Sequence, residues 1–181
     1  PFRDMKTFLT ELKARGFSGV QNFPTVGTYT AVYRQNIESV GISYDKEVEM
    51  VHIAHEMDLF TSPYAYTIEE AEKMTKAGAD IVVAHCRGTV GGMVGVAADG
   101  IMTIDEACKK VQDIHDAVTA INPETMVICH GGPIATPEDA AYVLSHTKGI
   151  AGFYGASSAE RLPVEQAIKQ QIQAFSAIEL F

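Results

Sequence analysis

The chain has 181 residues, of which 46% are hydrophobic and 20% charged, a globular composition that excludes intrinsic disorder and collagen-like structure. Fourteen Lys and Arg residues against 23 Asp and Glu residues give a net charge of −9, which argues against nucleic acid or an anionic membrane as the main partner, because both require a basic surface. No apolar run approaches the roughly 20 residues that span a bilayer, so we expect no membrane segment.

The cysteine content indicates a cellular location. Cys86, Cys108 and Cys129 form an odd, sparse set without a CxxC pair. Without a secretory signal they are typical of reduced thiols, so we expect a cytoplasmic protein without a structural zinc site. The chain begins at Pro1 rather than Met, and we expect it to have been cut from a longer chain. Turn-rich segments are short, which predicts a single domain over residues 1–181.

After an opening helix, one kind of unit occurs five times: a short β-branched or aromatic run, a polar loop and a helical pattern. The helices are predicted over residues 4–14, 44–57, 67–78 and 103–121, and from residues 136 and 163 onward. The strands are predicted over residues 19–23, 59–62, 81–84, 126–129 and 149–154. A loop of about 20 residues follows the first strand, a length that is usually functional.

Local signals support these helices. Thr67 with Glu70 and Thr103 with Glu106 have the spacing of a capping box, and Thr136 caps a further helix. Two helices carry a continuous apolar stripe at helical spacing. The stripes consist of Ile104, Cys108, Val111, Ile114, Val118 and Ile121 in one helix, and of Val164, Ile168, Ile172 and Phe175 in the last.

Alternation of strands and helices indicates an α/β fold with a parallel sheet. Right-handed crossovers leave two arrangements open, a doubly wound open sheet or a barrel. A complete eight-unit barrel takes about 250 residues, with about 200 as the lower bound, so a chain with five strands supplies only part of one.

In either arrangement, ligands bind at the carboxyl ends of the strands. His85 and His130 stand at equivalent strand ends, where a histidine serves as acid, base, electrophile or metal ligand. The alternative is a histidine that bonds a neighbouring backbone group. We predict both as catalytic residues, together with Glu160, the carboxylate nearest to a strand end. No third ligand is evident, so we predict no metal site formed by this chain's own residues.

The last two strand ends are rich in glycine and can offer backbone N–H groups to an anion. Ser157 or Ser158 can cap a short helix that points at the site, with Arg161 on its first turn. The alternative is a pair of tight turns with an unrelated cap. We predict a substrate-binding set at the strand ends that comprises Pro24, Tyr64, Arg87, Gly131, Gly132, Gly155, Ser157, Ser158 and Arg161.

Three further features bear on the chemistry. The glycine-rich segment 88–100 is predicted to be a mobile lid, with a plain crossover loop as the alternative. Cys129 and His130 are adjacent in a strand and point to opposite faces, which disfavours a Cys–His dyad. A Mg²⁺ enzyme normally needs a carboxylate immediately at a strand end, and none stands there in this sequence. Either the chemistry needs no metal or its ligands lie on strands outside this chain.

Three segments carry distinctive motifs, residues 17–27 (FSGVQNFPTVG), 129–134 (CHGGPI) and 152–163 (GFYGASSAERLP). In these the chain resembles, over essentially its whole length, the TIM-barrel family called phosphoenolpyruvate hydrolase-like, also known as TIM-barrel signal transduction proteins. The resemblance implies that the five strands are strands four to eight of a (β/α)8 barrel. The glycine-rich ends then follow strands seven and eight, the usual place for a phosphate.

The family name implies a relation to enzymes that handle 2-oxo acids and phosphonates with Mg²⁺. We therefore expect a hydrolase or lyase that acts on a small anionic 2-oxo acid, such as a phosphonopyruvate- or phosphoenolpyruvate-like compound, with any Mg²⁺ ligands on strands absent from this chain. The alternative is a non-catalytic domain that senses a small effector in signal transduction. Because a partial barrel exposes two strand edges, we also expect a homo-oligomer.

Overall fold

The computed structural model describes residues 3–95 and 101–179 as a mixed α/β fold with parallel strands, which confirms the predicted fold class. The helices are α1 (Met5–Ala14), α2 (Ala31–Ser39), α3 (Tyr44–Glu56), α4 (Ile68–Lys76), α5 (Ile104–Ile121), α6 (Pro137–Ser145) and α7 (Leu162–Ser176), with a 3-10 turn η1 (Val26–Thr28). The strands are β1 (Gly19–Val20), β2 (Phe60–Thr61), β3 (Tyr64–Ala65), β4 (Ile81–His85), β5 (Met126–His130) and β6 (Gly152–Phe153).

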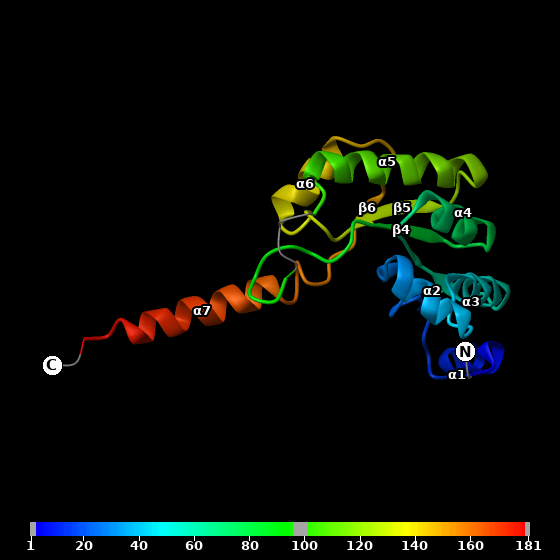
Figure 1. Cartoon of the computed structure of the whole chain (residues 1–181), viewed down its shortest axis with the longest axis horizontal. Coiled ribbons are helices and arrows are strands. Elements are labelled where there is room, and N and C mark those ends of the chain that lie inside the picture. Colours follow the sequence, from blue (N-terminus) through cyan, green and yellow to red (C-terminus); the bar gives the residue numbers. More distant parts are fainter. Residues whose placement is uncertain (1–2, 96–100, 180–181) are drawn as a thin grey trace.

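The strands form two parallel sheets, β1-β2 and β3-β4-β5-β6. The most extensive pairing joins β4 to β5 and runs from Ile81 opposite Met126 to His85 opposite His130. Helices α4, α5 and α6 lie along the outer side of the larger sheet, and α1 and α3 lie beside the smaller one (Figure 1). Among the described residues, no helix is both long and apolar enough to cross a membrane.

Side chains alternate across the sheet and build two apolar layers. Val82 and Ala84 of β4 lie in the main core, which packs the sheet against the helices. Val83 lies in a separate cluster with Tyr64 and Tyr66. Because successive strand residues point to opposite faces, His85 shares the face of Val83, away from the helices. Cys129 lies in the main core and His130 does not, so the two adjacent side chains separate as predicted.

Several predicted strands differ from the observed ones. The first is confined to Gly19–Val20 and the fifth to Gly152–Phe153, whereas β4 and β5 each extend by one residue to include their histidine. The strand predicted over residues 59–62 is confined to Phe60–Thr61, and an unpredicted strand, β3, follows Pro63, whose carbonyl accepts a hydrogen bond from the backbone N–H of Val83 (2.9 Å). The Asp80 carboxylate accepts a bond from the backbone N–H of Thr61 in β2 (2.8 Å).

The predicted 20-residue loop is also wrong, because it contains η1 and α2. Helix α2 is stabilised by an ion pair between Arg34 and Glu38 (3.0 Å), one turn apart. Its large side chains Val32 and Tyr33 are exposed, so the segment lacks the apolar periodicity that reveals a packed helix.

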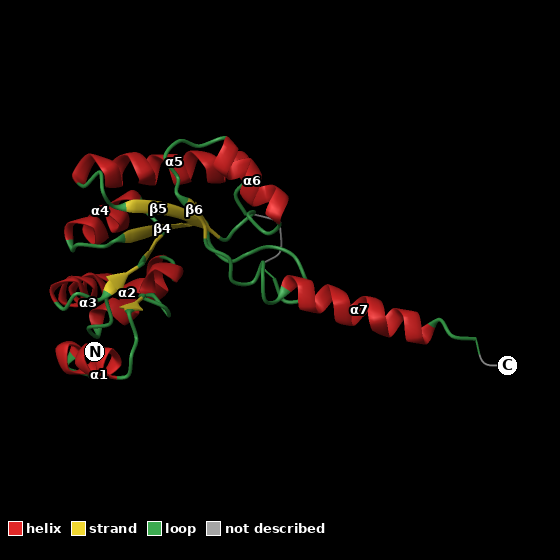
Figure 2. Ribbon diagram, turned by 180° about the vertical axis from the view of Figure 1, so that it is seen from behind, coloured by secondary structure: helices red, strands yellow, loops and turns green. Residues whose placement is uncertain are grey.

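Helix α7 extends away from the rest of the molecule, as both views show (Figure 1 and Figure 2). The sequence correctly predicts a helix here, but its apolar stripe is not covered. Val164, Ile168, Ile172 and Phe175 are between 53% and 62% exposed, and only Leu162 at the start of α7 is buried. The amphipathic pattern of this helix therefore has no packing partner among the described residues.

Candidate functional site

The predicted catalytic histidines meet at the carboxyl ends of β4 and β5. His85 and His130 are directly paired in the sheet register, and their ring centroids lie 4.5 Å apart at an interplanar angle of 86°. Each residue is 6% exposed. The parallel register therefore places two imidazoles side by side at the edge where this class of sheet binds its ligands.

Three tyrosines surround the pair. The ring of Tyr64 stacks on His130 (5.2 Å) and meets His85 edge-on (4.7 Å), so the structure brings this predicted binding residue to the histidine pair. Tyr66, which was not predicted as a site residue, stacks on His85 at 4.3 Å. Tyr154 lies tilted against His130 at 5.6 Å. Packing on these rings fixes the orientation of both imidazoles.

The two histidines hold opposite tautomers. The backbone N–H of Arg87 donates to Nδ1 of His85 (2.9 Å), so this Nδ1 carries no proton and the proton of the neutral ring sits on Nε2. Nδ1 of His130 lies 2.6 Å from the carbonyl oxygen of Tyr154. A carbonyl only accepts, so His130 carries its proton on Nδ1 and a lone pair on Nε2.

Neither Nε2 atom is completely buried. Neither has a hydrogen-bond partner within the described residues. In the same part of the chain, no side-chain nitrogen or oxygen is both buried and without a partner, so both Nε2 atoms are accessible to solvent. One ring thus presents a donor and the other an acceptor to whatever occupies the site.

Burial keeps the imidazoles neutral. Desolvation, reinforced by the charges of His130, Lys110 and Arg87, lowers the pKa of His85 to about 3. Desolvation also lowers the pKa of His130, against the opposing effect of its bond to the Tyr154 carbonyl. Both rings therefore stay uncharged at neutral pH, and the donor and acceptor roles persist.

A backbone hydrogen bond joins the loops that follow β4 and β5, next to the histidines. Arg87 adopts a φ of 76°, and its carbonyl oxygen accepts a bond from the backbone N–H of Gly132 (2.8 Å). A Cβ on Gly131 would lie 2.2 Å from that same oxygen, so only glycine fits. The Gly132 N–H, predicted to face an anion, is thus engaged within the protein.

The segment that follows β6 in the sequence forms turns rather than the predicted short helix. The backbone N–H groups of Ala159 and Glu160 both bond the carbonyl of Ala156 (2.9 Å each), and that of Leu162 bonds the carbonyl of Ser157 (2.9 Å). The prediction of a separate helix at Ser157 or Ser158 is wrong, because these turns lead directly into α7. Gly155 begins this stretch, and its neighbourhood is occupied by the Ser158 side chain.

Arg161 and Glu160 make no hydrogen bond or ion pair to the histidine pair within the described residues. The Arg161 guanidinium bonds the carbonyl of Gly91 (3.0 Å) and the carboxylate of Glu165 (3.3 Å). Glu160 is exposed. The predicted roles of both residues stay predictions.

The first part of the glycine-rich segment rests on α7. The backbone N–H of Met93 donates to the Glu165 carboxylate (2.7 Å), beside the bond from Arg161 to Gly91. Gly92 has a φ of 79°, a backbone conformation that favours glycine at this contact. Residues 96–100 of the predicted lid lie outside the described residues, and its movement stays a prediction.

A buried polar network that sequence reasoning missed supports Tyr64. The Asn22 side chain accepts from the backbone N–H of Tyr64 (2.7 Å) and donates to its carbonyl oxygen (3.2 Å), as a neighbouring strand would. The Tyr44 hydroxyl donates to the same carbonyl (2.6 Å). Asn22 interrupts an otherwise β-prone run just before Pro24, and that polar interruption was the available signal.

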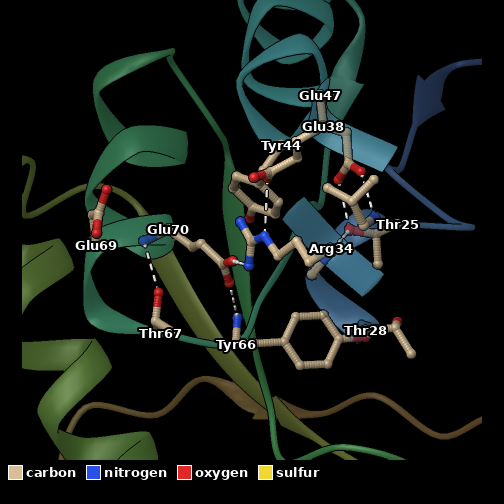
Figure 3. Close-up of polar contacts among 12 residues, drawn as sticks. Thr25, Thr28, Arg34, Glu38, Tyr44, Glu47, Tyr66, Thr67, Glu69 and Glu70 are labelled. Atoms are coloured by element: carbon tan, nitrogen blue, oxygen red, sulfur yellow. Dashed lines mark hydrogen bonds and ion pairs between the residues drawn. The ribbon is translucent and has the colours of Figure 1, made fainter. Parts of the chain in front are cut away.

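Glu47 anchors the loop that begins at Pro24. Its carboxylate accepts hydrogen bonds from the Asn22 amide (2.7 Å), the Thr25 hydroxyl (2.6 Å) and the backbone N–H of Val26 (2.7 Å), part of which Figure 3 shows. Burial raises the pKa of Glu47, while these bonds oppose the shift. Pro24, a predicted binding residue, is exposed at the start of this anchored loop.

A second network surrounds Glu70. Its carboxylate accepts from the Arg34 guanidinium (2.6 Å) and from the backbone N–H of Tyr66 (2.8 Å) (Figure 3). The predicted capping box at Thr67 is therefore only half formed, since the Glu70 carboxylate is used elsewhere. A cavity of about 610 Å³ lies beside it between α2, α3 and α4. Arg34 and Lys73 on its wall are both paired with carboxylates, which indicates a structural ion-pair cluster.

The described residues do not fit Mg²⁺. They contain no group of three or more His, Cys, Asp or Glu side chains placed to hold a metal ion. The half-buried carboxylate of Glu47 and the buried carboxylate of Glu70 already accept hydrogen bonds on both oxygens. No step of the chemistry below is assigned to a metal.

Parallel strands, outer helices and a site at the carboxyl strand ends define part of a (β/α)8-barrel protein. The model of the family described as phosphoenolpyruvate hydrolase-like matches residues 1–178, and the chain belongs to this family. The chain is 52% identical over 180 residues to the "ToMV susceptible protein tm-1(GCR26)" of Solanum lycopersicum. That alignment covers 99% of this chain and 24% of the tomato protein, so the chain spans about a quarter of this relative's length.

Solved structures show the same fold at low identity. Dihydrodipicolinate synthase is similar with a TM-score of 0.57 and 15% identity, over 90% of this chain and 55% of that one. A 2,3-dimethylmalate lyase, a member of the PEP mutase/isocitrate lyase superfamily, is similar with a TM-score of 0.55 and 12% identity, over 96% of this chain and 60% of that one. The predicted partial barrel is thereby confirmed.

Proposed function

We propose that the protein is an enzyme of the lyase or hydrolase type that acts on a small anionic 2-oxo acid, such as a phosphonopyruvate- or phosphoenolpyruvate-like compound. The observation that carries the proposal is the pair of neutral histidines, His85 and His130, whose rings lie side by side at the strand ends and whose Nε2 atoms are not fully buried. The family description supports the substrate class. The likeness in fold to a lyase of the PEP mutase/isocitrate lyase superfamily agrees with it.

Arg87 is the cation that we assign to the substrate's anionic group. Its side chain is exposed next to His85, and no carboxylate pairs with it in the described ranges. Arg161, by contrast, is already paired with Glu165. Gly131, Ser157 and Ser158 remain proposed contacts to the same anion at the last two strand ends.

Thermal melting with and without phosphonopyruvate, in the presence and absence of Mg²⁺, tests the site. A ligand at 100 times its dissociation constant stabilises by about 2.7 kcal/mol, and a pyruvate-release assay then follows. We expect Arg87→Gln to reduce the stabilisation and Arg15→Gln, on the distant α1, to leave it unchanged. Absence of both a shift and pyruvate release contradicts this substrate class.

The second candidate is an effector-sensing domain. The segment from Gly91 to Met93 contacts α7 through Arg161 and Glu165, so a ligand at the site has a route to a distant helix. The tomato relative's name refers to a virus response rather than to a reaction. His130→Ala separates the candidates, because it abolishes turnover in an enzyme and changes only affinity in a sensor.

We further propose that the protein forms a homo-oligomer in the cytoplasm. The uncovered stripe of α7, from Val164 to Phe175, and the unpaired outer edges of β1 and β6 both favour contact with a second copy. Cys86, Cys108 and Cys129 are all free thiols, which suits a reducing compartment.

A further inference from the structure

We propose that His130 and His85 divide one reaction between them: Nε2 of His130 removes a proton from the carbon next to a carbonyl, and the Nε2–H of His85 donates a hydrogen bond to that carbonyl's oxygen. This inference rests on the proposed function and assigns the chemistry of the same site. It makes the protein a catalyst of enolisation, and it gives two similar-looking histidines different tasks.

The assignment follows from the hydrogen bond that Nδ1 of each ring already makes to the backbone. The lone pair on Nδ1 of His85 accepts the Arg87 N–H (2.9 Å), so the only exchangeable position left on this ring is a donor. The N–H on Nδ1 of His130 is held by the Tyr154 carbonyl (2.6 Å), so the only position left on that ring is a lone pair. A general base requires the second arrangement, and a neutral electrophile requires the first.

The backbone enforces the difference. Turning the His130 ring over would break its bond to the Tyr154 carbonyl and present a C–H to that oxygen. Turning the His85 ring over would do the same to the Arg87 N–H. Tyr64 packs against both imidazoles, which further restricts rotation. The tautomers are therefore fixed before any ligand binds, which is the preorganisation that catalysis exploits.

The spacing suits one small substrate. The ring centroids are 4.5 Å apart and nearly perpendicular, so one small molecule is within reach of both rings. A carbonyl oxygen and the C–H on the neighbouring carbon are close together in the same molecule. One 2-oxo acid with a hydrogen on carbon 3 can contact both rings, with its anionic group on the side of Arg87.

The step balances without a further reactant. The proton on carbon 3 moves to Nε2 of His130, the electrons of that C–H bond form the C=C bond, and the carbonyl π electrons move to oxygen. The resulting enolate oxygen accepts the hydrogen bond from His85, and the imidazolium of His130 returns a proton to carbon 3. In D₂O the returned proton is a deuteron, so the net result is isotope exchange.

The test follows deuterium entry into the methyl group of pyruvate by ¹H NMR, with the protein in D₂O. We expect exchange above the buffer rate, and a loss of at least about 100-fold in His130→Gln, because an amide is no base. His85→Gln keeps an N–H near the Nε2 position and should lose only about tenfold, whereas His85→Leu should lose about 100-fold or more. His52→Gln, at an exposed position on α3, is the matched control and should exchange as the parent does.

A parallel measurement does not depend on the ligand. Long-range ¹H–¹⁵N correlation spectra report which nitrogen of each imidazole carries the proton, and we expect Nε2–H for His85 and Nδ1–H for His130. The reverse assignment, or a His130→Gln variant that exchanges at the parent rate, overturns the proposal.

Failure of this inference is distinguishable from failure of the proposed function. Pyruvate that raises the melting temperature without any exchange refutes enolisation by the pair and leaves the anion site standing. Absence of exchange with pyruvate, together with phosphonopyruvate that neither stabilises the protein nor releases pyruvate, refutes both.

Discussion

Helices α5 and α7 carry the same kind of apolar pattern and have different environments. In α5 the stripe residues Cys108, Val111, Ile114 and Val118 are all buried against the sheet and α4. In α7 the equivalent residues Val164, Ile168, Ile172 and Phe175 are more than half exposed, and the helix points away from the molecule (Figure 2). Periodicity predicts that a helix has an apolar face, but it does not reveal which surface covers that face.

The difference has a topological cause. Helix α5 connects β4 to β5, so both of its ends are tied to neighbouring strands that are paired over their full length. Helix α7 follows the last strand and, among the described residues, is held at its start alone, by Leu162 in the body and by the bonds of Arg161 and Glu165 to the glycine-rich segment. Its apolar face is therefore available to a second copy.

The largest effect is expected from a charge in α5. Val111 is 0% exposed, so Val111→Asp buries a carboxylate without a partner. Such changes cost several kcal/mol, and we expect a loss of about 4 kcal/mol or more in the free energy of unfolding. Denaturant titration followed by circular dichroism measures it. A stable Val111→Asp protein would mean that α5 does not pack as described.

The same charge on α7 should act on association instead. Ile168→Asp with Ile172→Asp removes two apolar side chains from the proposed interface, worth about 3 kcal/mol together. We expect sedimentation velocity to show an oligomer for the parent chain and a dissociated, still folded variant. Gln166→Asp with Gln170→Asp adds equal charge on the other side of α7 and serves as the control. A parent chain that sediments as a monomer at all concentrations contradicts the homo-oligomer.

The comparison extends to how much of the fold the sequence predicts. Strands β4 and β5 are continuous apolar runs with a histidine at the end, so their position and the meeting of His85 with His130 could be predicted. The tautomers could not, because Nδ1 of each ring bonds a backbone group, Arg87 N–H or the Tyr154 carbonyl, and backbone partners leave no mark in the sequence.

The N-terminal units were harder to predict for a related reason. Their strands have two residues each and are held by side-chain hydrogen bonds as well as by ladder bonds, as Asn22 holds Tyr64 and Asp80 holds Thr61. Such contacts join residues about 20 to 40 positions apart, so no local sequence pattern predicts them. The turns after β6 were misjudged because serine caps helices and also occurs in turns.

Substitution of Asn22 tests whether its side-chain hydrogen bonds to the Tyr64 backbone stabilise the fold. In Asn22→Ala, the backbone N–H and carbonyl of Tyr64 lose a partner in a buried place, and the Glu47 carboxylate loses one of its donors. We expect a loss of about 2 kcal/mol in the free energy of unfolding. Substitution of Gln21, whose amide donates to the carbonyl of Ser62 in a half-buried position, is the matched control and should cost less. Equal losses in the two variants would deny Asn22 its special role.

The effect that probes the site most directly is a pH slope. Burial, the charge of His130 and the nearby Lys110 and Arg87 lower the pKa of His85 from 6.5 to about 3 in the folded chain. Between those values the unfolded chain binds a proton at this residue and the folded chain does not, so stability falls as the pH falls through that window. One such group contributes a slope of about 1.4 kcal/mol per pH unit. Removing it in His85→Gln should flatten the measured dependence by that amount, whereas His52→Gln should run parallel to the parent. If His85→Gln shows the parent slope, the imidazole of His85 is already charged or solvated in the folded chain, and its role as a neutral donor fails with it.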